Sequence, residues 1–322
     1  MLDIKRILYA TDFSPCSDGA FPPALQLAER YGAELHMLHA IVLHADDPHD
    51  AAHHFPEPEE LYERLRSRAD ERMAAWTDGH GPSELQIVRA QRRGISPATV
   101  ILEYADEQEI DLIVVGTHGR RGLRHLLLGS VAEEVVRLAE CPVLTVRQGA
   151  IGGWTGFERI LVPMDYSEHS DVALSYGKEF AAAEGARLHL LHVLEVGTYP
   201  DFYFPVQAAQ MFDMPELEKR ARAHLRDRLE RAPGPEMEAS LKVELGHPAQ
   251  KIAEFAEEGV RADLVVIASH GRSALQRVLL GSVAEGVIRR ARIPVLIVKS
   301  FGKSLLPVAD AAEEGENVRA PD

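Results

Sequence analysis

Short runs of apolar residues alternate along the chain with longer stretches in which apolar side chains recur every three or four positions. In the first 150 residues the runs are Arg6–Ala10, Leu35–Val42, Leu85–Ala90, Leu112–Gly116 and Val143–Val146. Such runs are typical of parallel strands buried on both faces. Between them, helical spacing covers Pro22–Tyr31, Glu57–Trp76, Pro97–Glu107 and Ser130–Ala139. This alternation predicts an open, doubly wound, Rossmann-like α/β sheet with helices on both faces.

The pattern then repeats. Residues 116–147, placed over 268–299 without gaps, are identical at 18 of 32 positions, and Arg6–Ala20 likewise matches Arg159–Ala173. We therefore interpret the chain as two tandem domains, 1–148 and 157–300, each with a five-stranded parallel sheet. A glycine-rich linker is predicted at 149–156. The acidic segment 301–322 is expected to be a mobile tail.

The composition limits the partners and the compartment that we expect for this protein. A net charge of −15 over 322 residues disfavours nucleic acids and anionic membrane surfaces as partners. The two cysteines, Cys16 and Cys141, lack a metal-binding spacing, which suits a reducing compartment. The N-terminal residues pass directly into a predicted strand, without an apolar segment long enough for a signal peptide or a membrane span. We expect a cytoplasmic protein.

The loop "GTHGRRGLRHLLLGS", residues 116–130, has the character of an anion-binding loop. Its glycines allow a tight turn, and its last residues open a predicted helix whose free N–H groups attract anions. It lacks the lysine of a P-loop, and Arg120, Arg121 and Arg124 supply positive charge instead. The second repeat carries "ASHGRSALQRVLLGS" at 268–282. The alternative is that these glycines merely end a strand and begin a helix.

An aspartate follows the first strand of each repeat, in "YATDF" and "VPMDY". Asp12 and Asp165 would lie at the sheet edge where ligands of such folds bind, and a carboxylate there can accept hydrogen bonds from ribose hydroxyls. The backbone at Ala10–Thr11 or Pro163–Met164 would read an adenine, and the small apolar residue after the second-strand histidine would pack on its ring. Alternatively, the aspartates cap the next helix and the apolar residues belong to the core.

These motifs together resemble the universal stress protein family in its UspA-like, nucleotide-binding form, and the resemblance covers both repeats. It implies a stress-response regulator that binds ATP or a related adenine nucleotide, with Mg²⁺ as an accompanying ion. The matching positions in the first repeat are Ala10, Thr11, Asp12 and Ala40 for the nucleoside, and Gly116, Thr117, His118, Gly119, Arg120, Gly129, Ser130 and Val131 for the phosphates. In the second repeat they are Pro163, Met164, Asp165, Val193, Ser269, His270, Gly271, Arg272, Gly281, Ser282 and Val283.

The second repeat departs from the motif at Ala268, where the first repeat has Gly116. A methyl group there would shift the ligand if the glycine serves close approach, or would strain the backbone if the glycine has a positive φ. We therefore expect nucleotide binding at the second site to be weaker or absent. Separately, Pro22 and Pro23 predict that the first helix of the first repeat starts late or bends near Phe21.

Catalysis is not expected to be the main activity. The loops contain no carboxylate to act as a base, and we interpret His118 and His270 as phosphate- or backbone-binding groups, so hydrolysis should be slow or absent. No catalytic residue is assigned. No GxGxxG follows the first strand, which argues against a dehydrogenase.

The competing hypothesis is an interaction module with vestigial phosphate loops and an unknown regulatory protein partner. Its apolar closing strands, 141–147 and 293–299, need covering, and the resemblance suggests that they pair within one chain. A homodimer of the whole chain is left open. The histidines and aspartates of residues 44–54 have the chemistry for a divalent metal but no fixed ligand spacing, so a solvated loop is favoured.

Overall fold

The computed structural model describes residues 2–42, 58–77, 85–117, 128–147, 149, 156–195, 214–271 and 280–306. The first repeat contains β1 (Arg6–Ala10), α1 (Pro15–Asp18), α2 (Phe21–Tyr31), β2 (Glu34–Ile41), α3 (Pro58–Thr77), β3 (Ile87–Arg93), α4 (Pro97–Glu107), β4 (Leu112–Gly116), α5 (Ser130–Leu138) and β5 (Val143–Val146). The second contains β6 (Arg159–Pro163), α6 (Glu168–Glu184), β7 (Arg187–Leu194), α8 (Met214–Arg231), β8 (Ala239–Leu245), α9 (Pro248–Glu254), the π-helical turn η1 (Phe255–Gly259), β9 (Leu264–Ala268), α10 (Ser282–Arg290) and β10 (Val295–Val298).

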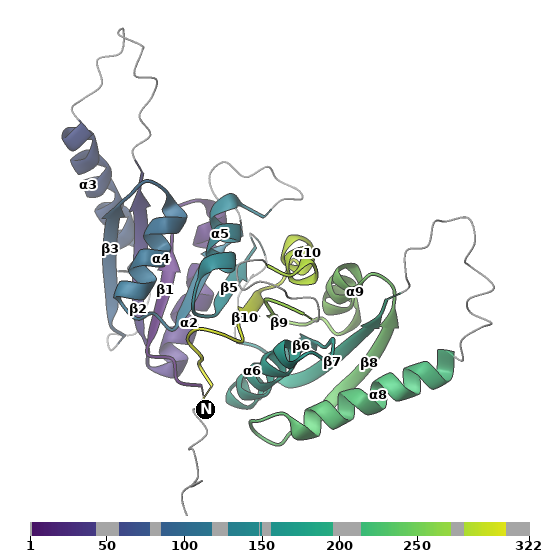
Figure 1. Cartoon of the computed structure of the whole chain (residues 1–322). Coiled ribbons are helices and arrows are strands. Elements are labelled where there is room, and N and C mark those ends of the chain that lie inside the picture. The colour runs from purple at the N-terminus through teal and green to yellow at the C-terminus, as the bar shows by residue number, and fades with distance from the viewer. Residues whose placement is uncertain are drawn as a thin grey trace, which may run out of the picture.

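Within these ranges the strands form one ten-stranded sheet in the order β3-β2-β1-β4-β5-β10-β9-β6-β7-β8 (Figure 1). Neighbouring strands run parallel, except for the antiparallel pair of β5 and β10 at the centre. The prediction of doubly wound parallel sheets is confirmed, and the two five-stranded halves are joined edge to edge.

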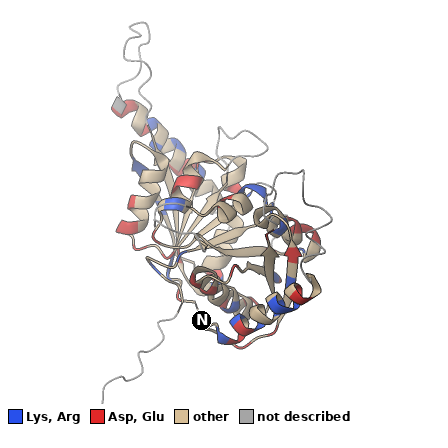
Figure 2. Ribbon diagram, turned by 45° about the vertical axis from the view of Figure 1, so that its right-hand side comes forward, with Lys and Arg blue, Asp and Glu red and all other residues tan. Residues whose placement is uncertain are grey.

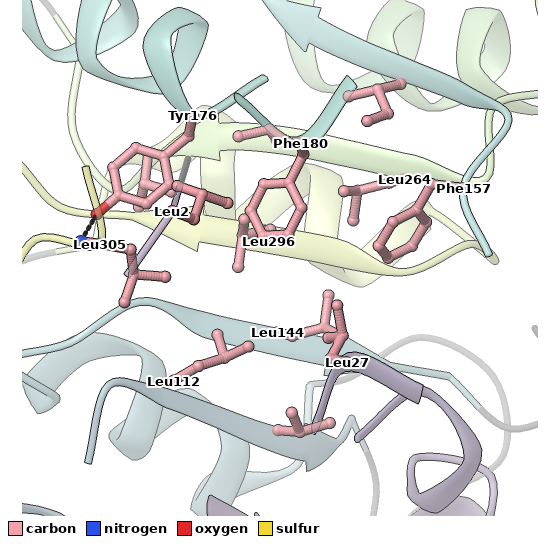
Figure 3. Packing of buried hydrophobic residues seen from close by; sticks show 14 of the residues in the cluster. Leu2, Leu27, Leu112, Leu144, Phe157, Tyr176, Phe180, Leu264, Leu296 and Leu305 are labelled. Atoms are coloured by element: carbon pink, nitrogen blue, oxygen red, sulfur yellow. Dashed lines mark hydrogen bonds between the residues drawn. The ribbon is translucent and has the colours of Figure 1, made fainter. Parts of the chain in front are cut away.

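Helices cover both faces of this sheet, and each face has one apolar layer that is shared by the two repeats. Helices α2, α3, α6 and α8 contribute buried residues to one layer, and α4, α5, α9 and α10 contribute to the other. At the centre of the first layer, Leu27 and Leu144 of the first repeat lie opposite Phe180 and Leu296 of the second (Figure 3). The two repeats therefore share a core rather than merely touching.

The apolar runs located the strands of the first repeat to within a few residues. The largest difference is β3, which was predicted at Leu85–Ala90 and extends to Arg93. Its extension contains arginines, because an outer strand does not need apolar side chains to be buried. The prediction about the prolines is confirmed: α1 ends at Asp18, and α2 restarts at Phe21 with proline in its first turn, whereas α6 of the second repeat is unbroken.

The antiparallel seam between β5 and β10 confirms that the closing strands pair with each other. Val295 pairs with Thr145, and the hydroxyl of Thr145 also donates to the carbonyl oxygen of Val295 at 3.2 Å. Both strands are buried along their whole length. The pairing therefore covers two apolar edges that would otherwise be open to association.

Two cations cross the seam in opposite directions and reach the carboxyl end of a helix in the other repeat. Arg147, which follows β5, donates to the carbonyl oxygen of Arg289 in α10 at 3.3 Å. Lys299, which follows β10, donates to the carbonyl oxygens of Arg137 at 3.1 Å and of Ala139 at the end of α5. Carbonyls in the last turn of a helix lack partners within the helix, and the dipole favours positive charge there. Each repeat thus satisfies the last helix of the other.

Residues 301–306, assigned to the mobile tail from sequence, pack against both repeats, so the packed chain extends at least to Leu306. Leu305 is fully buried, and its N–H donates to the hydroxyl of Tyr176 in α6 at 2.8 Å (Figure 3). Its carbonyl oxygen accepts the N–H of Asp3 at 2.9 Å. The segment therefore ties α6 to the N-terminal residues of the first repeat.

The Lys299→Met variant tests the electrostatics of the seam. Burial lowers the pKa of Lys299 from 10.5 to about 8, against the opposing influence of Cys141 and Glu140. Between these pH values the folded protein has released a proton that the unfolded chain still binds, so the free energy of unfolding rises with pH. Wild type should gain on the order of 3 kcal/mol relative to Lys299→Met over this range, measured by urea unfolding. Arg147→Met is the matched control, because a guanidinium keeps its charge and its effect should not change with pH; a flat difference for both variants would contradict the account.

Gly302→Ala tests the packing of residues 301–306. Gly302 has a φ of +77°, and a Cβ atom there would overlap the carbonyl oxygen of Glu140. We expect a loss of about 2–4 kcal/mol in the free energy of unfolding, from backbone strain and the clash together. Gly185→Ala is the control, since Gly185 has a φ of +68° with no atom within 4 Å of the added Cβ. It should cost only about 1 kcal/mol; equal losses would mean that the clash is relieved without cost.

Candidate functional site

The candidate site of the first repeat lies where the winding of the sheet reverses. β1 and β4 are neighbours, with Ala10 paired to Val115, so their carboxyl ends emerge side by side. β2 lies on the other side of β1, and β5 on the other side of β4. Crevices of this kind bind ligands in open α/β sheets. The second repeat has the same arrangement, with β6 between β7 and β9.

The described members of the predicted sites gather at these two edges with graded exposure. Buried are Ala10, Thr11, Thr117, Pro163, Met164, Ala268, Ser269 and His270; partly exposed are Asp12, Ala40, Gly116, Gly129, Val131, Asp165, Val193, Gly271, Gly281 and Val283; exposed are Ser130 and Ser282. The remaining predicted residues lie outside the described ranges: His118, Gly119, Arg120, Arg121, Arg124, Arg272 and the histidine- and aspartate-rich residues 44–54.

Each predicted phosphate loop is closed at its base by one backbone hydrogen bond. The N–H of Gly129 donates to the carbonyl oxygen of Thr117 at 2.8 Å, and the N–H of Gly281 donates to that of Ser269 at 2.8 Å. The bond brings the end of β4 or β9 against the start of α5 or α10. Both helices have a glycine at the N-cap, which supplies no side-chain hydrogen bond. First-turn amides at such an end suit an anion.

The aspartate after the first strand shapes the turn that follows it. The carboxylate of Asp12 accepts the N–H of Ser14 at 2.9 Å, and that of Asp165 accepts the N–H of Ser167 at 3.0 Å. The helix caps are the serines themselves, whose hydroxyls accept an N–H three residues later. The alternative that the aspartates cap the helices is therefore wrong. Each carboxylate lies at the sheet edge, just after the end of β1 or β6.

In the second repeat the aspartate lies beside Gly271 of the predicted phosphate loop. A Cβ atom added to Gly271 would lie 2.6 Å from Oδ2 of Asp165. The absence of a side chain at Gly271 therefore makes room for the carboxylate. Gly281 lies close by, since a Cβ atom there would be 3.9 Å from the nitrogen of Gly271. Three positions that are far apart in sequence thus form one compact corner.

An aromatic residue with positive φ follows the aspartate in both repeats. Phe13 has a φ of 59° and Tyr166 a φ of 64°, a conformation that costs energy for a bulky side chain. The ring of Phe13 packs on His39 with centroids 4.5 Å apart, and that of Tyr166 packs on His192 at 4.2 Å. These contacts hold the turn in its unusual shape.

The same histidines fix the backbone beside the site. Nδ1 of His39 lies 2.8 Å from the carbonyl oxygen of Thr11, and Nδ1 of His192 lies 2.7 Å from that of Met164, so both nitrogens donate. The N–H groups of Thr11 and Met164 donate to β2 and β7. The backbone expected to read an adenine is therefore largely engaged, and only a second lone pair on each carbonyl remains for a ligand.

A positive charge from a different helix supports each aromatic turn. The guanidinium of Arg72 in α3 lies 4.7 Å from the ring centroid of Phe13, and that of Arg228 in α8 donates to the carbonyl oxygen of Tyr166 at 3.2 Å. Arg228 also pairs with Asp171. Burial raises the pKa of Asp171, and its arginine partner opposes that shift. Each turn is thus held by contacts from two other elements, a strand and a helix.

Sequence reasoning missed these supporting residues, although the repeat displayed them. The stretch "DFSPCSD" at 12–18 matches "DYSEHSD" at 165–171 in its aspartates, aromatic residue and serines. An aromatic residue kept between a turn-forming aspartate and a capping serine was the available signal. The positive φ itself leaves no mark in sequence, because it arises from the packing described above.

Gly116 is required by a helix rather than by an unusual backbone conformation. Its φ is outside the positive region, and a Cβ atom there would lie 3.0 Å from the backbone of Cys16 and Ser17 in α1. Ala268 also has an ordinary φ and carries its methyl group in the same place on β9. The strain considered for Ala268 is therefore absent, and the glycine serves close approach to α1.

His270 contacts a neighbouring hydroxyl and a second histidine ring. Its Nδ1 lies 2.8 Å from the hydroxyl of Ser269, and its ring lies 6.0 Å from that of His169. Ala40 and Val193 pack against the core with partial exposure, so the structure supports both readings of these positions. In the described part of the chain, no three residues among His, Cys, Asp and Glu are grouped as metal ligands. No helix in that part has the length and apolar character to cross a membrane.

Comparison with known proteins gives a consistent result. The model of the universal stress protein family matches residues 3–147 and 156–299. A universal stress protein of Mycolicibacterium smegmatis is 30% identical over 302 residues, which cover 91% of this chain and 96% of that protein. One from Mycobacterium tuberculosis is 31% identical over 212 residues, or 63% of this chain and 66%, just under two thirds, of that protein.

Solved structures of universal stress proteins match most of the chain or about half of it. The crystal structure of a universal stress protein from Archaeoglobus fulgidus has a TM-score of 0.64 and 23% identity, covering 91% of this chain and 98% of that one. This likeness shows the fold alone. A universal stress protein solved in complex with cAMP is 28% identical over 45% of this chain, with a TM-score of 0.31.

Gly116→Ala tests the role of the first loop glycine. The backbone of α1 must move by a few tenths of an ångström to admit the methyl group, so we expect a loss of about 1 kcal/mol in the free energy of unfolding. Gly19→Ala, at the end of the same helix, is the control: its Cβ would be 3.5 Å from the nearest atom, and its φ is −66°. That variant should be neutral or stabilising by up to about 1 kcal/mol. Equal effects of the two variants in urea unfolding would refute the close-contact explanation.

Proposed function

The chain belongs to the universal stress protein family, and from this premise we propose that it is a regulatory protein that binds ATP or a related adenine nucleotide at the two sheet edges. The proposal is carried by one observation above the others. In both repeats a backbone hydrogen bond joins a helix start without a side-chain cap to the end of β4 or β9, the strand that neighbours the aspartate-bearing β1 or β6. An anion and a ribose have complementary groups in that corner.

The phosphates would lie on the helix start. The N–H groups of the first turn of α5 and the hydroxyl of the exposed Ser130 are suitable hydrogen-bond donors to phosphate oxygens. Backbone donors replace the lysine of a P-loop in this arrangement. Mg²⁺ fits the same place, because it is commonly held by one or two side chains together with substrate phosphates. Ser130 is the described side chain that would contribute.

The nucleoside would lie over the ends of β1 and β2. The carboxylate of Asp12, which accepts the N–H of Ser14, is the kind of acceptor that ribose hydroxyls bind in such folds. Ala40 is partly exposed and apolar, which suits contact with a purine ring. The turn that presents Asp12 is held by Phe13 and His39, so the carboxylate is positioned before ligand binds.

We infer slow hydrolysis or none. Phosphoryl transfer needs a residue that positions the attacking water and charge stabilisation at the transferring group. In the described residues of the second site, Asp165 holds the turn at Ser167 and His270 contacts Ser269. These groups have structural partners, which favours a binding protein over an ATPase.

The second site is proposed to be the weaker one. Its edge carries Met164 where the first has Thr11. In the first repeat the hydroxyl of Thr11 accepts the N–H of Phe13 at 3.0 Å and lies 3.2 Å from the hydroxyl of Ser17. Loss of this polar cluster makes the second edge bulkier and less able to hydrogen-bond.

The proposal is tested by denaturing the purified protein and identifying any released nucleotide by mass spectrometry, followed by calorimetric titration of the emptied, refolded protein with ATP. We expect an adenine nucleotide, one tight binding step and one weaker step. Two equal steps would remove the difference between the sites. No released nucleotide together with no binding on titration would support the alternative, an interaction module with vestigial loops.

Gly271→Ala assigns the weaker step to the second repeat. The methyl group would lie 2.6 Å from Oδ2 of Asp165 and displace the carboxylate, which is the movable end of a side chain. Stability should change by less than about 0.5 kcal/mol, since the turn can keep its other contacts. The weaker binding step should be lost and the tight step kept. Loss of the tight step instead would mean that the sites are assigned the wrong way round.

A further inference from the structure

The outer strands of the ten-stranded sheet are β3 and β8, and their outer edges differ in chemistry. Central strands β4, β5, β10 and β9 contain no charged residue, whereas both outer strands do (Figure 2). In the described part of the chain, β8 pairs with β7 alone, so its other edge is unpaired. An unpaired edge is a template for another strand unless its side chains prevent it.

The backbone of β8 offers regularly spaced hydrogen-bonding groups at that edge. The N–H of Gly246 donates inward to the carbonyl oxygen of Leu194 in β7 at 3.0 Å. Because the direction alternates along a strand, residues 240, 242 and 244 also face β7. Residues 239, 241, 243 and 245 therefore direct N–H and C=O away from the sheet. Val243 is at the centre of the charged part of this edge.

The side chains of β8 are complementary to a second copy of themselves. Lys242 and Glu244 flank Val243 and now pair along the strand at 3.2 Å. If two β8 strands pair antiparallel with Val243 opposite Val243, each Lys242 lies opposite a Glu244 of the other copy. These are non-hydrogen-bonded positions, where opposing side chains are closest. Centring the pair on Lys242 or Glu244 instead would oppose like charges, so the charges select one register.

An apolar contact accompanies the charges in that register. Leu245 is 48% exposed, and it would lie opposite Leu241 of the other copy on the same face of the sheet. Leu241 lines a groove of about 790 Å³ between α8 and the start of β8, together with Leu229 and Met237. Leu245 of each copy would therefore lie beside the groove of the other, which removes an exposed leucine from water.

The outer edge of β3 is unsuited to the same use. Its arginines would face one another in an antiparallel self-pairing about Gln91, because Arg89 would lie opposite Arg93. The side chains are also engaged by α3: Arg89 donates to the hydroxyl of Thr77 at 3.4 Å, Arg93 pairs with Glu59 at 3.3 Å, and Gln91 donates to Asp70. The first half of the sheet thus protects its edge with charges of one sign, whereas the charges of β8 are of opposite sign.

We propose that the chain forms a two-fold homodimer by antiparallel pairing of β8 with β8 of a second copy, centred on Val243. The interface is isologous, so both copies contribute the same two charges and the same leucine. β8 lies one strand away from β6, with Glu244 beside Val193 of β7. The ionic part of the interface is screened by salt, and the dimer should weaken as ionic strength rises.

The test is analytical ultracentrifugation of the full chain over a concentration series. Wild type should show a concentration-dependent dimer. Lys242→Glu and Glu244→Lys each place like charges opposite one another and should raise the dimer dissociation constant about tenfold or more. An equimolar mixture of the two variants should recover dimer, because every opposing pair is then of opposite sign. The double variant K242E/E244K should dimerise like wild type for the same reason.

Arg92→Glu on β3 is the control, and it should leave the dimer unchanged. Circular dichroism and thermal unfolding of each variant establish that the fold is intact. A wild type that is monomeric at all concentrations overturns the proposal. So does a dimer that neither single variant weakens, since the interface would then lie elsewhere. Weakened single variants whose mixture fails to recover dimer would also overturn it, because pairing in this register requires complementation.

Discussion

The antiparallel seam between β5 and β10 is the contact on which the rest of the structure depends. These strands carry no charge and are buried along their length, so neither could stay open at the edge of a separate domain. Pairing them merges two sheets and two apolar layers into one body. Arg147 and Lys299 then complete the last helix of the opposite repeat. Because α5 and α10 begin at the candidate sites and end at the seam, the geometry of each site rests on a contact with the other repeat.

The aromatic turn after the first strand shows how tertiary contacts impose a locally unfavourable shape. Phe13 and Tyr166 adopt positive φ, which bulky side chains avoid. In each repeat a histidine from the second strand packs on the ring and binds the neighbouring carbonyl, while an arginine from the following helix contacts the turn. Since the same shape occurs twice with different aromatic residues, it is set by the fold around it. Its effect is to hold the aspartate at the sheet edge.

The features that could be predicted from sequence are those that local forces determine. Apolar runs located the strands because burial on both faces demands them, and the duplication exposed the paired sites. The charged end of β3 was missed because an outer strand escapes that demand. The packing of residues 301–306 was missed because the acidic composition of the whole segment 301–322 gives no indication that one of its leucines, Leu305, is buried. Loop glycines could be recognised, yet the reason for Gly116 depends on a helix a hundred residues away.

The close contact between Gly116 and α1 links two differences between the repeats that look unrelated in sequence. The first repeat has prolines at 22–23, a helix broken after Asp18, and Gly116 at the end of β4. The second has an unbroken α6 and Ala268 at the end of β9. In the first repeat the backbone of the short α1 lies against Gly116 and leaves no room for a methyl group. In the second, Ala268 carries a methyl group at the end of β9 and is buried in the apolar layer to which α6 contributes. The glycine and the proline break therefore belong to a single packing arrangement, so this one-residue difference between the loop motifs reflects the helix that packs against the end of the strand.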